Sequence, residues 1–281
     1  MGRVWFGTSS WSEKGWIGPF YPPGTAPREM LPFYATQFPA VEADVTYYRI
    51  PSHTMVADWA ARAGEGFRIA SKFPREIVHG GEGATPDPSK ALLWAKVGAA
   101  AEAFIDVMRD LGEALGPMII QCPYYNKSVF DSRDAFLQRL NGFLERLPLD
   151  LRFGIELRNR NYLTAELMAI LETHRVSLVW ADIPYMPPPW QYADAIRRPT
   201  ASFRYVRLIG DRKATEALTG TFSGIVTDRS GQIREWARFV AGECDRFEDI
   251  FVFANNHFAG FGPATIREFM QVLTEIRGGS E

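Results

Sequence analysis

The chain contains 281 residues, of which 46% are hydrophobic and 23% charged, and its formal net charge is −2. Such a composition is typical of a water-soluble protein with enough chain for a sizeable core, and the near-neutral charge argues against extended contact with nucleic acid. The sequence has no signal-peptide pattern and no apolar run that would span a membrane. Cys122 and Cys244 form neither a disulfide framework nor a zinc motif, so we expect a cytoplasmic protein.

Segments with the pattern of a strand recur along the chain, and most are followed by a segment with helical periodicity. We predict eight strands, over residues 4–10, 41–49, 67–73, 118–122, 152–158, 177–183, 203–209 and 249–256. Helices are predicted over residues 28–38, 54–63, 90–115, 134–147, 164–174, 232–243 and 264–277. A long loop is expected over 74–89. The segment 184–200, after the sixth strand, contains three consecutive prolines and is expected to be irregular.

Eight strands separated by helices match a (β/α)8 barrel, and we predict one TIM-like α/β domain over residues 1–281. An open doubly wound sheet is the competing arrangement, but its strands tend to be apolar on both faces. Here several strands carry polar residues on one face only. Lys72 shares a face with Ala70, and Arg207 shares one with Tyr205. This parity favours the barrel.

The segment 41–49 shows the polar face best. In a continuous strand, Glu42, Asp44, Thr46 and Tyr48 would lie on the same side. Unpaired buried carboxylates are costly, so a hydrophobic core alone does not explain them. We expect this face to look into the barrel mouth, where barrel enzymes have their active sites.

Polar residues near the ends of the other strands are expected at the same mouth. The full set is Glu42, Asp44, Lys72, Gln121, Glu156, Arg158, Asp182, Arg207, Asn255, Asn256 and His257, with Trp11 and Tyr48 as aromatic neighbours. No phosphate-binding glycine loop, nucleophile elbow or His-Glu-x-x-His helix is present. The site is therefore predicted only from the positions of these polar residues near the ends of the predicted strands.

Glu42 and Glu156 are candidates for an acid/base or nucleophile pair. The alternative is an internal ion-pair network that they form with Lys72, Arg158 and Arg207. For Lys72 we favour an electrostatic role over covalent chemistry. The two arginines suit bidentate contacts to a carboxylate or phosphate.

The remaining candidates have weaker patterns. Adjacent residues alternate, so Asn255 and His257 are expected to face the mouth while Asn256 caps or orients a loop. His79 is expected to be a solvated loop residue. For Trp11 and Tyr48, packing under a loop is preferred to stacking on a ligand. We predict no cofactor; a divalent metal bound by Glu42, Glu156, Asp182 and His257 has suitable ligand types but no supporting spacing.

Several motifs together resemble the YecE-like family, catalogued as domain of unknown function 72. They are Gly7-Thr8-Ser9-Ser10-Trp11, the run from Val41 to Ser52, 67–74 with Lys72, Glu156-Leu157-Arg158, Tyr205-Val206-Arg207-Leu208 and Phe253-Ala254-Asn255-Asn256. The resemblance covers nearly the whole chain and implies a TIM barrel without an established reaction, cofactor or substrate. It departs from the family pattern at Asp44, where Asn is usual, at Val45, where Ser or Thr is usual, and at Ile209, where His is usual.

The sequence thus predicts an enzyme that acts on a small polar or anionic substrate by acid/base chemistry, with a preference for hydrolysis. Gln121, Asn255 and Asn256 would orient the substrate. The alternative is a binding module for a nucleotide, sugar or nucleic-acid segment. A third reading, suggested by the residue at position 209, is an enzyme that has lost its activity. Oligomeric state is not predicted.

Overall fold

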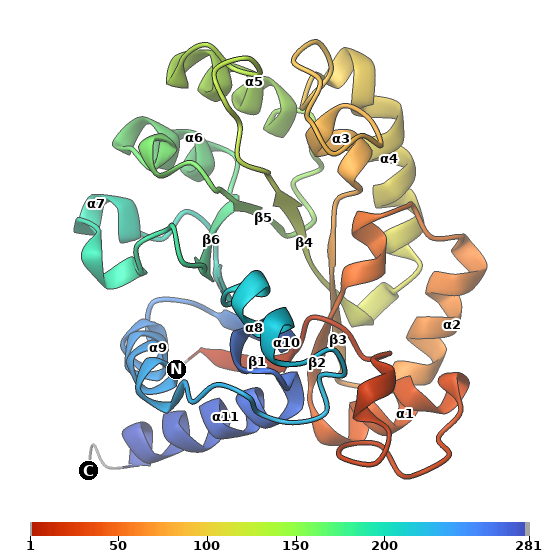
Figure 1. The fold of residues 1–281 in the computed structure, drawn as a ribbon. Helices are drawn as coiled ribbons and strands as arrows, with labels where there is room; N and C mark the ends of the chain where they lie inside the picture. Colours follow the sequence, from red (N-terminus) through yellow and green to blue (C-terminus); the bar gives the residue numbers. More distant parts are fainter. Residues whose placement is uncertain (1, 279–281) are drawn as a thin grey trace.

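The computed structural model describes residues 2–278 and shows eight parallel strands in a nearly closed barrel, surrounded by helices (Figure 1). The strands are adjacent in the order β1-β8-β7-β6-β5-β4-β3-β2. Their bounds are β1 Arg3–Thr8, β2 Ala40–Ala43, β3 Arg68–Lys72, β4 Leu115–Gln121, β5 Phe153–Glu156, β6 Ser177–Asp182, β7 Phe203–Leu208 and β8 Asp249–Ala254. The predicted TIM-like (β/α)8 fold is confirmed.

The helices follow the strands in the expected alternation. They are α1 Pro27–Gln37, α2 His53–Ala63, α3 Arg75–His79, α4 Trp94–Arg109, α5 Arg133–Leu144, α6 Ala165–Thr173, α7 Asp194–Arg197, α8 Arg212–Leu218, α9 Ser230–Glu243, α10 Asn256–Ala259 and α11 Gly262–Gly278. Local signals start several of them: Pro27 is the first residue of α1, and the Ser52 hydroxyl caps α2. The proline-rich segment after β6 contains a single 3-10 turn, Pro189–Gln191, and the short α7. Within residues 2–278, no helix combines the length and apolarity needed to cross a bilayer.

The barrel has two separate apolar layers, as strand parity predicts. Its interior is filled by a small cluster that includes Ala70, Ile119 and Tyr205. The opposite faces of the strands pack against the helices in a much larger cluster. Polar residues that continue the inner parity toward the C-terminal ends of the strands, such as Lys72 and Arg207, therefore lie above the inner cluster.

One junction of the barrel is not closed by a backbone ladder. Among the described residues, every other neighbouring pair of strands forms a ladder, but β1 and β2 do not. The buried Tyr34 hydroxyl bridges them instead. It accepts a hydrogen bond from the Thr8 backbone N–H at 2.7 Å and donates one to the Ala40 carbonyl at 3.3 Å. The strands approach closely at Gly7, where a Cβ would lie 1.9 Å from the Ala40 carbonyl oxygen.

The prediction of one continuous strand over 41–49 is wrong. β2 ends at Ala43, and Asp44–Tyr47 form a 3-10 helix. The chain turns there because the Thr46 hydroxyl accepts a hydrogen bond from the Lys72 backbone N–H at 2.9 Å and lies 2.8 Å from the Lys72 carbonyl oxygen. The predicted loop over 74–89 begins with α3, and α8 follows β7; both helices are too short to show clear periodicity.

Candidate functional site

Arg207, on β7, is the centre of a buried ion cluster inside the barrel. Its guanidinium donates to Glu42 Oε1 at 2.8 Å, to Gln121 Oε1 at 2.7 Å, and to Glu156. These partners come from β2, β4 and β5, and each of the four side chains lies near the C-terminal end of its strand. The structure therefore brings together Glu42, Gln121, Glu156 and Arg207, which the sequence places up to 165 residues apart.

Both glutamates of this cluster are buried and ionised. Burial raises the pKa of Glu42, but the charges of Arg207 and Lys72 outweigh it and hold the pKa below its ordinary value. For Glu156 burial is outweighed in the same way by Arg207 and Arg158. The buried Tyr205 hydroxyl adds a hydrogen bond to Glu42 Oε2 at 2.7 Å. Neither carboxyl group is thus suited to hold a proton near neutral pH.

Lys72, the last residue of β3, is the one group of the cluster whose pKa lies near neutral. Burial is the largest cause that lowers this pKa, to about 7; the nearby Arg207 charge lowers it as well, while Glu42 and Glu156 oppose the shift. The side chain is 5% exposed. Its Nζ lies 4.0 Å from Glu42 Oε1 and contacts the Asp44 carboxylate, which is 33% exposed. Lys72 therefore connects the buried cluster to the surface of the mouth.

Arg158 and Asp44 form the partly exposed rim beside this cluster. The Arg158 side chain is 28% exposed, and its guanidinium NH2 lies 3.1 Å from Glu156 Oε1. Tyr47 lies against Lys72, with Nζ 5.5 Å from the ring centroid. The Tyr47 hydroxyl is 3.1 Å from His79 Nε2. The expectation that His79 is solvated is wrong: the residue is only 6% exposed, because α3 brings it under the mouth.

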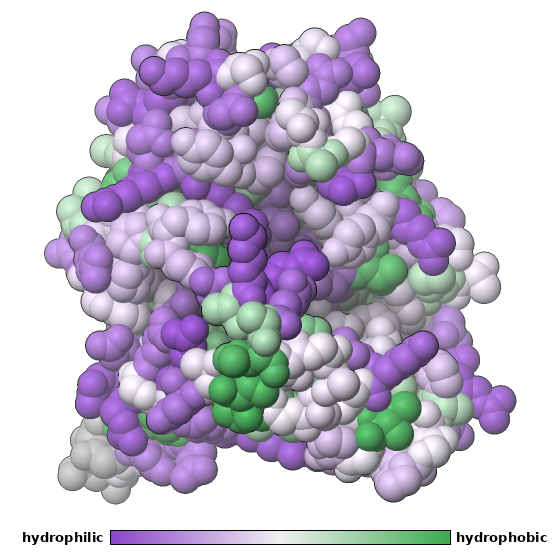
Figure 2. All heavy atoms as spheres, in the orientation of Figure 1, coloured by the Kyte–Doolittle hydropathy of each residue, from purple (hydrophilic) through white to green (hydrophobic). Residues whose placement is uncertain are grey.

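Hydrophilic side chains gather around a hollow in the middle of the face shown in Figure 2, where α8 and α10 lie in front of the strands in Figure 1. Arg207 also has a buried Nε atom without a hydrogen-bond partner among the described residues. Buried donors of this kind are rare, and this N–H differs from the other Arg207 donors, whose hydrogen bonds go to Glu42, Gln121 and Glu156.

Asp182 does not join the cluster, although it ends β6. Its carboxylate accepts hydrogen bonds from Gln232 Nε2 at 2.9 Å and Trp236 Nε1 at 2.5 Å, both on α9. Val179 belongs to the inner cluster, so Asp182, three residues later, has the outer parity. Burial raises the pKa of Asp182, although these two hydrogen bonds oppose the shift.

The three residues after β8 also have local partners. Asn255 is the N-cap of α10, where its side-chain oxygen accepts from the His257 backbone N–H at 2.9 Å. Asn256 Oδ1 accepts from the Gly262 backbone N–H at 2.9 Å and from Trp16 Nε1 at 3.2 Å. His257 Nε2 lies 3.2 Å from the Glu216 carboxylate. Asn256 thus connects the start of α11 to the loop that carries Trp16, in keeping with the capping or orienting role expected for it, and Asn255 has a capping role as well.

The two aromatic candidates differ in exposure. Trp11 packs edge-on against Trp59, with ring centroids 5.3 Å apart, as expected for a residue under a loop. Tyr48 is 70% exposed and touches the Tyr47 ring. Tyr48 is thus accessible to a ligand, and packing does not account for it.

No metal centre is formed by the part of the chain that the structure describes. Within residues 2–278, no group of three or more His, Cys, Asp or Glu side chains is arranged to hold a metal ion. Two of the four ligand candidates, Asp182 and His257, are held by partners away from Glu42 and Glu156.

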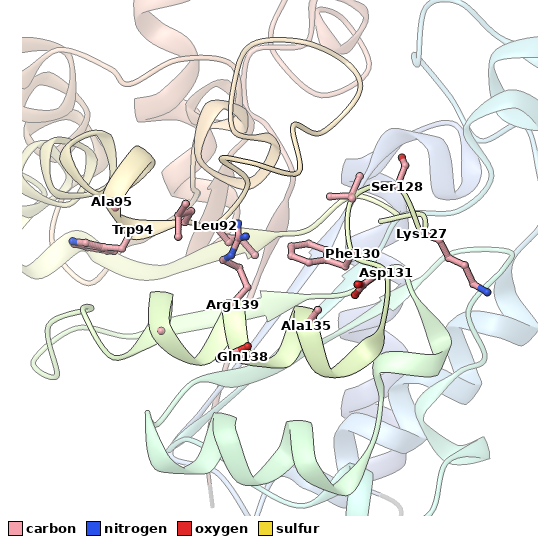
Figure 3. A pocket seen from close by; sticks show the side chains of 13 residues that line it. Leu92, Trp94, Ala95, Lys127, Ser128, Phe130, Asp131, Ala135, Gln138 and Arg139 are labelled. Carbon is pink, nitrogen blue, oxygen red and sulfur yellow. The ribbon is translucent and has the colours of Figure 1, made fainter.

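A separate cavity of about 610 Å³ lies outside the barrel, between the start of α4 and α5 (Figure 3). Apolar residues such as Leu92, Phe130 and Trp94 line much of it. Arg139 extends toward Leu92 in this view, but its guanidinium already donates to the Ala91 carbonyl at 2.8 Å. The cavity contains none of the clustered ionisable groups of the mouth.

Three residues that build this site are not among the predicted site residues: Tyr205, Thr46 and His79. The inner parity that Tyr205 shares with Arg207 was a usable signal for it. The other two act through the 3-10 helix and α3, which the sequence does not predict.

This geometry defines the class of protein: a (β/α)8 barrel with a buried ion cluster at the C-terminal ends of its strands. The family model described as "Protein of unknown function DUF72" matches residues 5–279, and the chain belongs to this family. The resemblance noted in the sequence is thereby confirmed. None of the curated proteins compared with the chain matches it.

Two solved structures are similar in fold. The DUF72 family protein of Thermotoga maritima MSB8 is 19% identical with a TM-score of 0.70, and the alignment covers 98% of this chain and 99% of that one. For the DUF72 family protein of Enterococcus faecalis V583 the identity is 22%, the TM-score 0.68 and the coverage 96% and 95%.

Proposed function

We propose that this protein is an enzyme that binds a small anionic substrate at the barrel mouth and uses Lys72 for proton transfer. The observation that carries the proposal is the buried Lys72 ammonium beside Arg207, with a pKa of about 7. A group with a pKa near the working pH is present in both protonation states and can donate or accept a proton efficiently. Perturbed groups of this kind concentrate at functional sites.

The other cluster residues have supporting roles in this proposal. Arg158, partly exposed at the rim, binds the anionic group of the substrate, since its guanidinium presents several donors in one plane. Arg207 is held rigidly by Glu42 and Glu156 and stabilises negative charge that develops next to Lys72.

Hydrolysis by a Glu42–Glu156 pair stays a prediction. Such a mechanism needs one carboxyl group with a raised pKa as the general acid. Both glutamates are instead ion-paired with the same arginine, and the pKa of each is lowered. Proton transfer by Lys72 is therefore the reaction that the arrangement supports better.

The proposal can be tested in two stages. A panel of small carboxylates and phosphate esters is screened by thermal shift against the wild type and the Arg158→Gln variant. Compounds that stabilise only the wild type are then incubated with the enzyme in D2O, and exchange or conversion is followed by proton NMR. We expect turnover by the wild type and loss of turnover in Lys72→Met. Arg160→Gln, at an exposed position two residues away, is the matched control for Arg158.

The result that would overturn the proposal is equal stabilisation of the wild type and Arg158→Gln by every anion. Turnover that persists in Lys72→Met would remove Lys72 from the chemistry. If a glycoside or phosphoester is cleaved and the activity depends on Glu42 and Glu156 but not on Lys72, hydrolysis is supported instead.

A second candidate function is binding without catalysis, favoured by three exposed tyrosines. Tyr48, Tyr124 and Tyr185 follow β2, β4 and β6 and are 70%, 64% and 56% exposed. Aromatic rings at a rim can stack on a sugar or a base. Nucleosides and oligosaccharides belong in the same thermal-shift panel, with the three Tyr→Ala variants; stabilisation without conversion supports this function.

A further inference from the structure

We propose that Lys72 forms a Schiff base with a small aldehyde or ketone that carries a carboxylate or phosphate group. This inference rests on the proposed function and names its substrate class. It gives Lys72 a covalent role, in contrast to the electrostatic role that the sequence favours.

Among the described residues, the carboxylate that contacts the Lys72 amine is that of the partly exposed Asp44, while the two buried carboxylates nearby are bound to Arg207. Glu42 and Glu156 both bind Arg207 directly, whereas Lys72 Nζ is 4.0 Å from Glu42. Arg207 is a fixed cation, because a guanidinium does not lose its proton in a protein. A lysine that is desolvated next to such a cation is an activated nucleophile. Lys72 meets both conditions, since its side chain is also 5% exposed.

The approach to the amine lies on the side of Asp44. This carboxylate contacts Lys72 Nζ and is itself 33% exposed, so the two groups meet at the edge of the mouth. On the neighbouring side, the Tyr47 ring is 5.5 Å from Nζ, and its hydroxyl is held by His79. A carbonyl carbon that displaces Asp44 from Nζ thus enters between a carboxylate and an aromatic wall.

Asp44 is also placed to move the protons of the reaction. It accepts a proton from the ammonium, and the free lone pair of the amine forms a C–N bond as the C=O π bond breaks. The nitrogen then passes one of its two remaining protons to the former carbonyl oxygen, which becomes a hydroxyl group. The same carboxyl group then protonates that hydroxyl, which leaves as water when the C=N bond forms. The balance is one ammonium and one carbonyl compound giving one protonated imine and one water. No oxidant or reductant is required.

The anionic group of the substrate is expected at Arg158. This guanidinium is 28% exposed and is anchored by Glu156, the same carboxylate that binds Arg207. Its charge is close enough to contribute to the lowered pKa of Lys72. A compound of a few carbons therefore suffices to reach both groups, which favours small oxo acids and sugar phosphates over larger carbonyl compounds.

Borohydride trapping tests the proposal on the unmodified protein. The wild type is incubated near neutral pH with pyruvate or glyceraldehyde 3-phosphate, or with acetone as the neutral control, and then reduced with sodium borohydride. Reduction converts the imine to a stable secondary amine, which peptide mass spectrometry locates. We expect labelling at Lys72 to exceed that at the exposed Lys90 by at least about tenfold, because burial beside the Arg207 cation makes the Lys72 ammonium lose its proton more readily. Lys90 is exposed but also has a carboxylate partner, Asp87, at 3.2 Å.

Two further measurements distinguish a nucleophile from a merely reactive surface amine. Labelling of Lys72 should rise with pH through a midpoint near 7. Lys72→Arg should lose the adduct, and Lys90→Arg should keep it. Arg158→Gln should weaken trapping of both anionic compounds more than that of acetone, which loses only the effect of the Arg158 charge on the Lys72 pKa. The relative loss for pyruvate and the phosphate identifies the preferred anion.

The inference is overturned if Lys72 carries no adduct with any of the carbonyl compounds, or if all lysines are labelled equally. Should small anions still stabilise the wild type but not Arg158→Gln, the proposed function survives and only the covalent step is rejected. If anions fail in that assay as well, both proposals fail.

Discussion

Replacing Arg207 by methionine would leave two buried carboxylates without their shared partner. Glu42 and Glu156 are 0% exposed, and both bind the Arg207 guanidinium. Because removal of one partner from a buried ion pair typically costs about 3–5 kcal/mol, we expect the free energy of unfolding to fall by about that amount at neutral pH. Lys72 and Arg158 remain close, so the loss should not exceed this range.

The pH dependence of this loss follows from the carboxyl groups. In the wild type their pKa values lie below the ordinary value of 4.5, so they contribute stability above that pH, and this contribution disappears as the pH falls through the folded-state values. Without Arg207, burial is expected to raise both pKa values above those of the unfolded chain. Acidification then stabilises the variant relative to the wild type, and the difference between them should shrink toward pH 5.

Urea denaturation followed by circular dichroism at pH 7.5 and pH 5 measures this difference. Arg198→Met is the control, since Arg198 forms an exposed pair with Glu172 at 2.9 Å and should cost less than about 1 kcal/mol. Adding Glu42→Gln and Glu156→Gln to the Arg207→Met variant should recover part of the loss at pH 7.5. A cost that is below about 1 kcal/mol, or that does not change with pH, would refute the reasoning.

Three further predictions concern other parts of the structure. Tyr34→Phe removes the hydroxyl between β1 and β2 and should reduce the free energy of unfolding by about 1–3 kcal/mol, whereas Tyr48→Phe, at an exposed ring, should change it little; urea denaturation compares them. Lys72 has a folded-state pKa of about 7 against 10.5 for the free group, so the unfolded chain binds more protons between these values and stability should rise with pH there. Lys72→Met should lack this rise and Lys90→Met should keep it, in denaturation series from pH 7 to 10. Asp182→Asn should leave anion binding in the thermal-shift assay unchanged, since the Asp182 carboxylate is hydrogen-bonded to α9. If anions stabilise this variant less than the wild type, Asp182 contributes to the anion site after all.

Strand parity explains both the successes and one avoidable failure of the sequence analysis. It predicted that Lys72, Gln121, Glu156 and Arg207 share the interior, because each lies two residues after an inner position. The same rule, applied from Val179, would have placed Asp182 on the outer face. Asp182 lies at the end of a strand, as the other candidates do, but parity and not position along the strand determines the direction of a side chain.

Other features depend on contacts that are distant in the sequence. The chain turns at Asp44 because Thr46 bonds to the backbone of Lys72, 26 residues later. The alternation of polar and apolar residues over 41–49 gives no sign of this turn. Similarly, the burial of His79 depends on α3, a helix of five residues, which is shorter than the window in which periodicity is visible.

The junction between β1 and β2, which the Tyr34 hydroxyl bridges, is a split in the backbone hydrogen bonding of the barrel. Ladders on the other sides of β1 and β2 would survive if this split widened, because among the described residues no backbone ladder crosses it and the Tyr34 hydroxyl bridges it instead. Glu42 lies two residues beyond Ala40, on the strand that borders the split. Any widening therefore displaces one anchor of Arg207 while Glu156, on the far wall, stays in place. The unladdered junction of the barrel and its buried ion cluster therefore share one strand, β2.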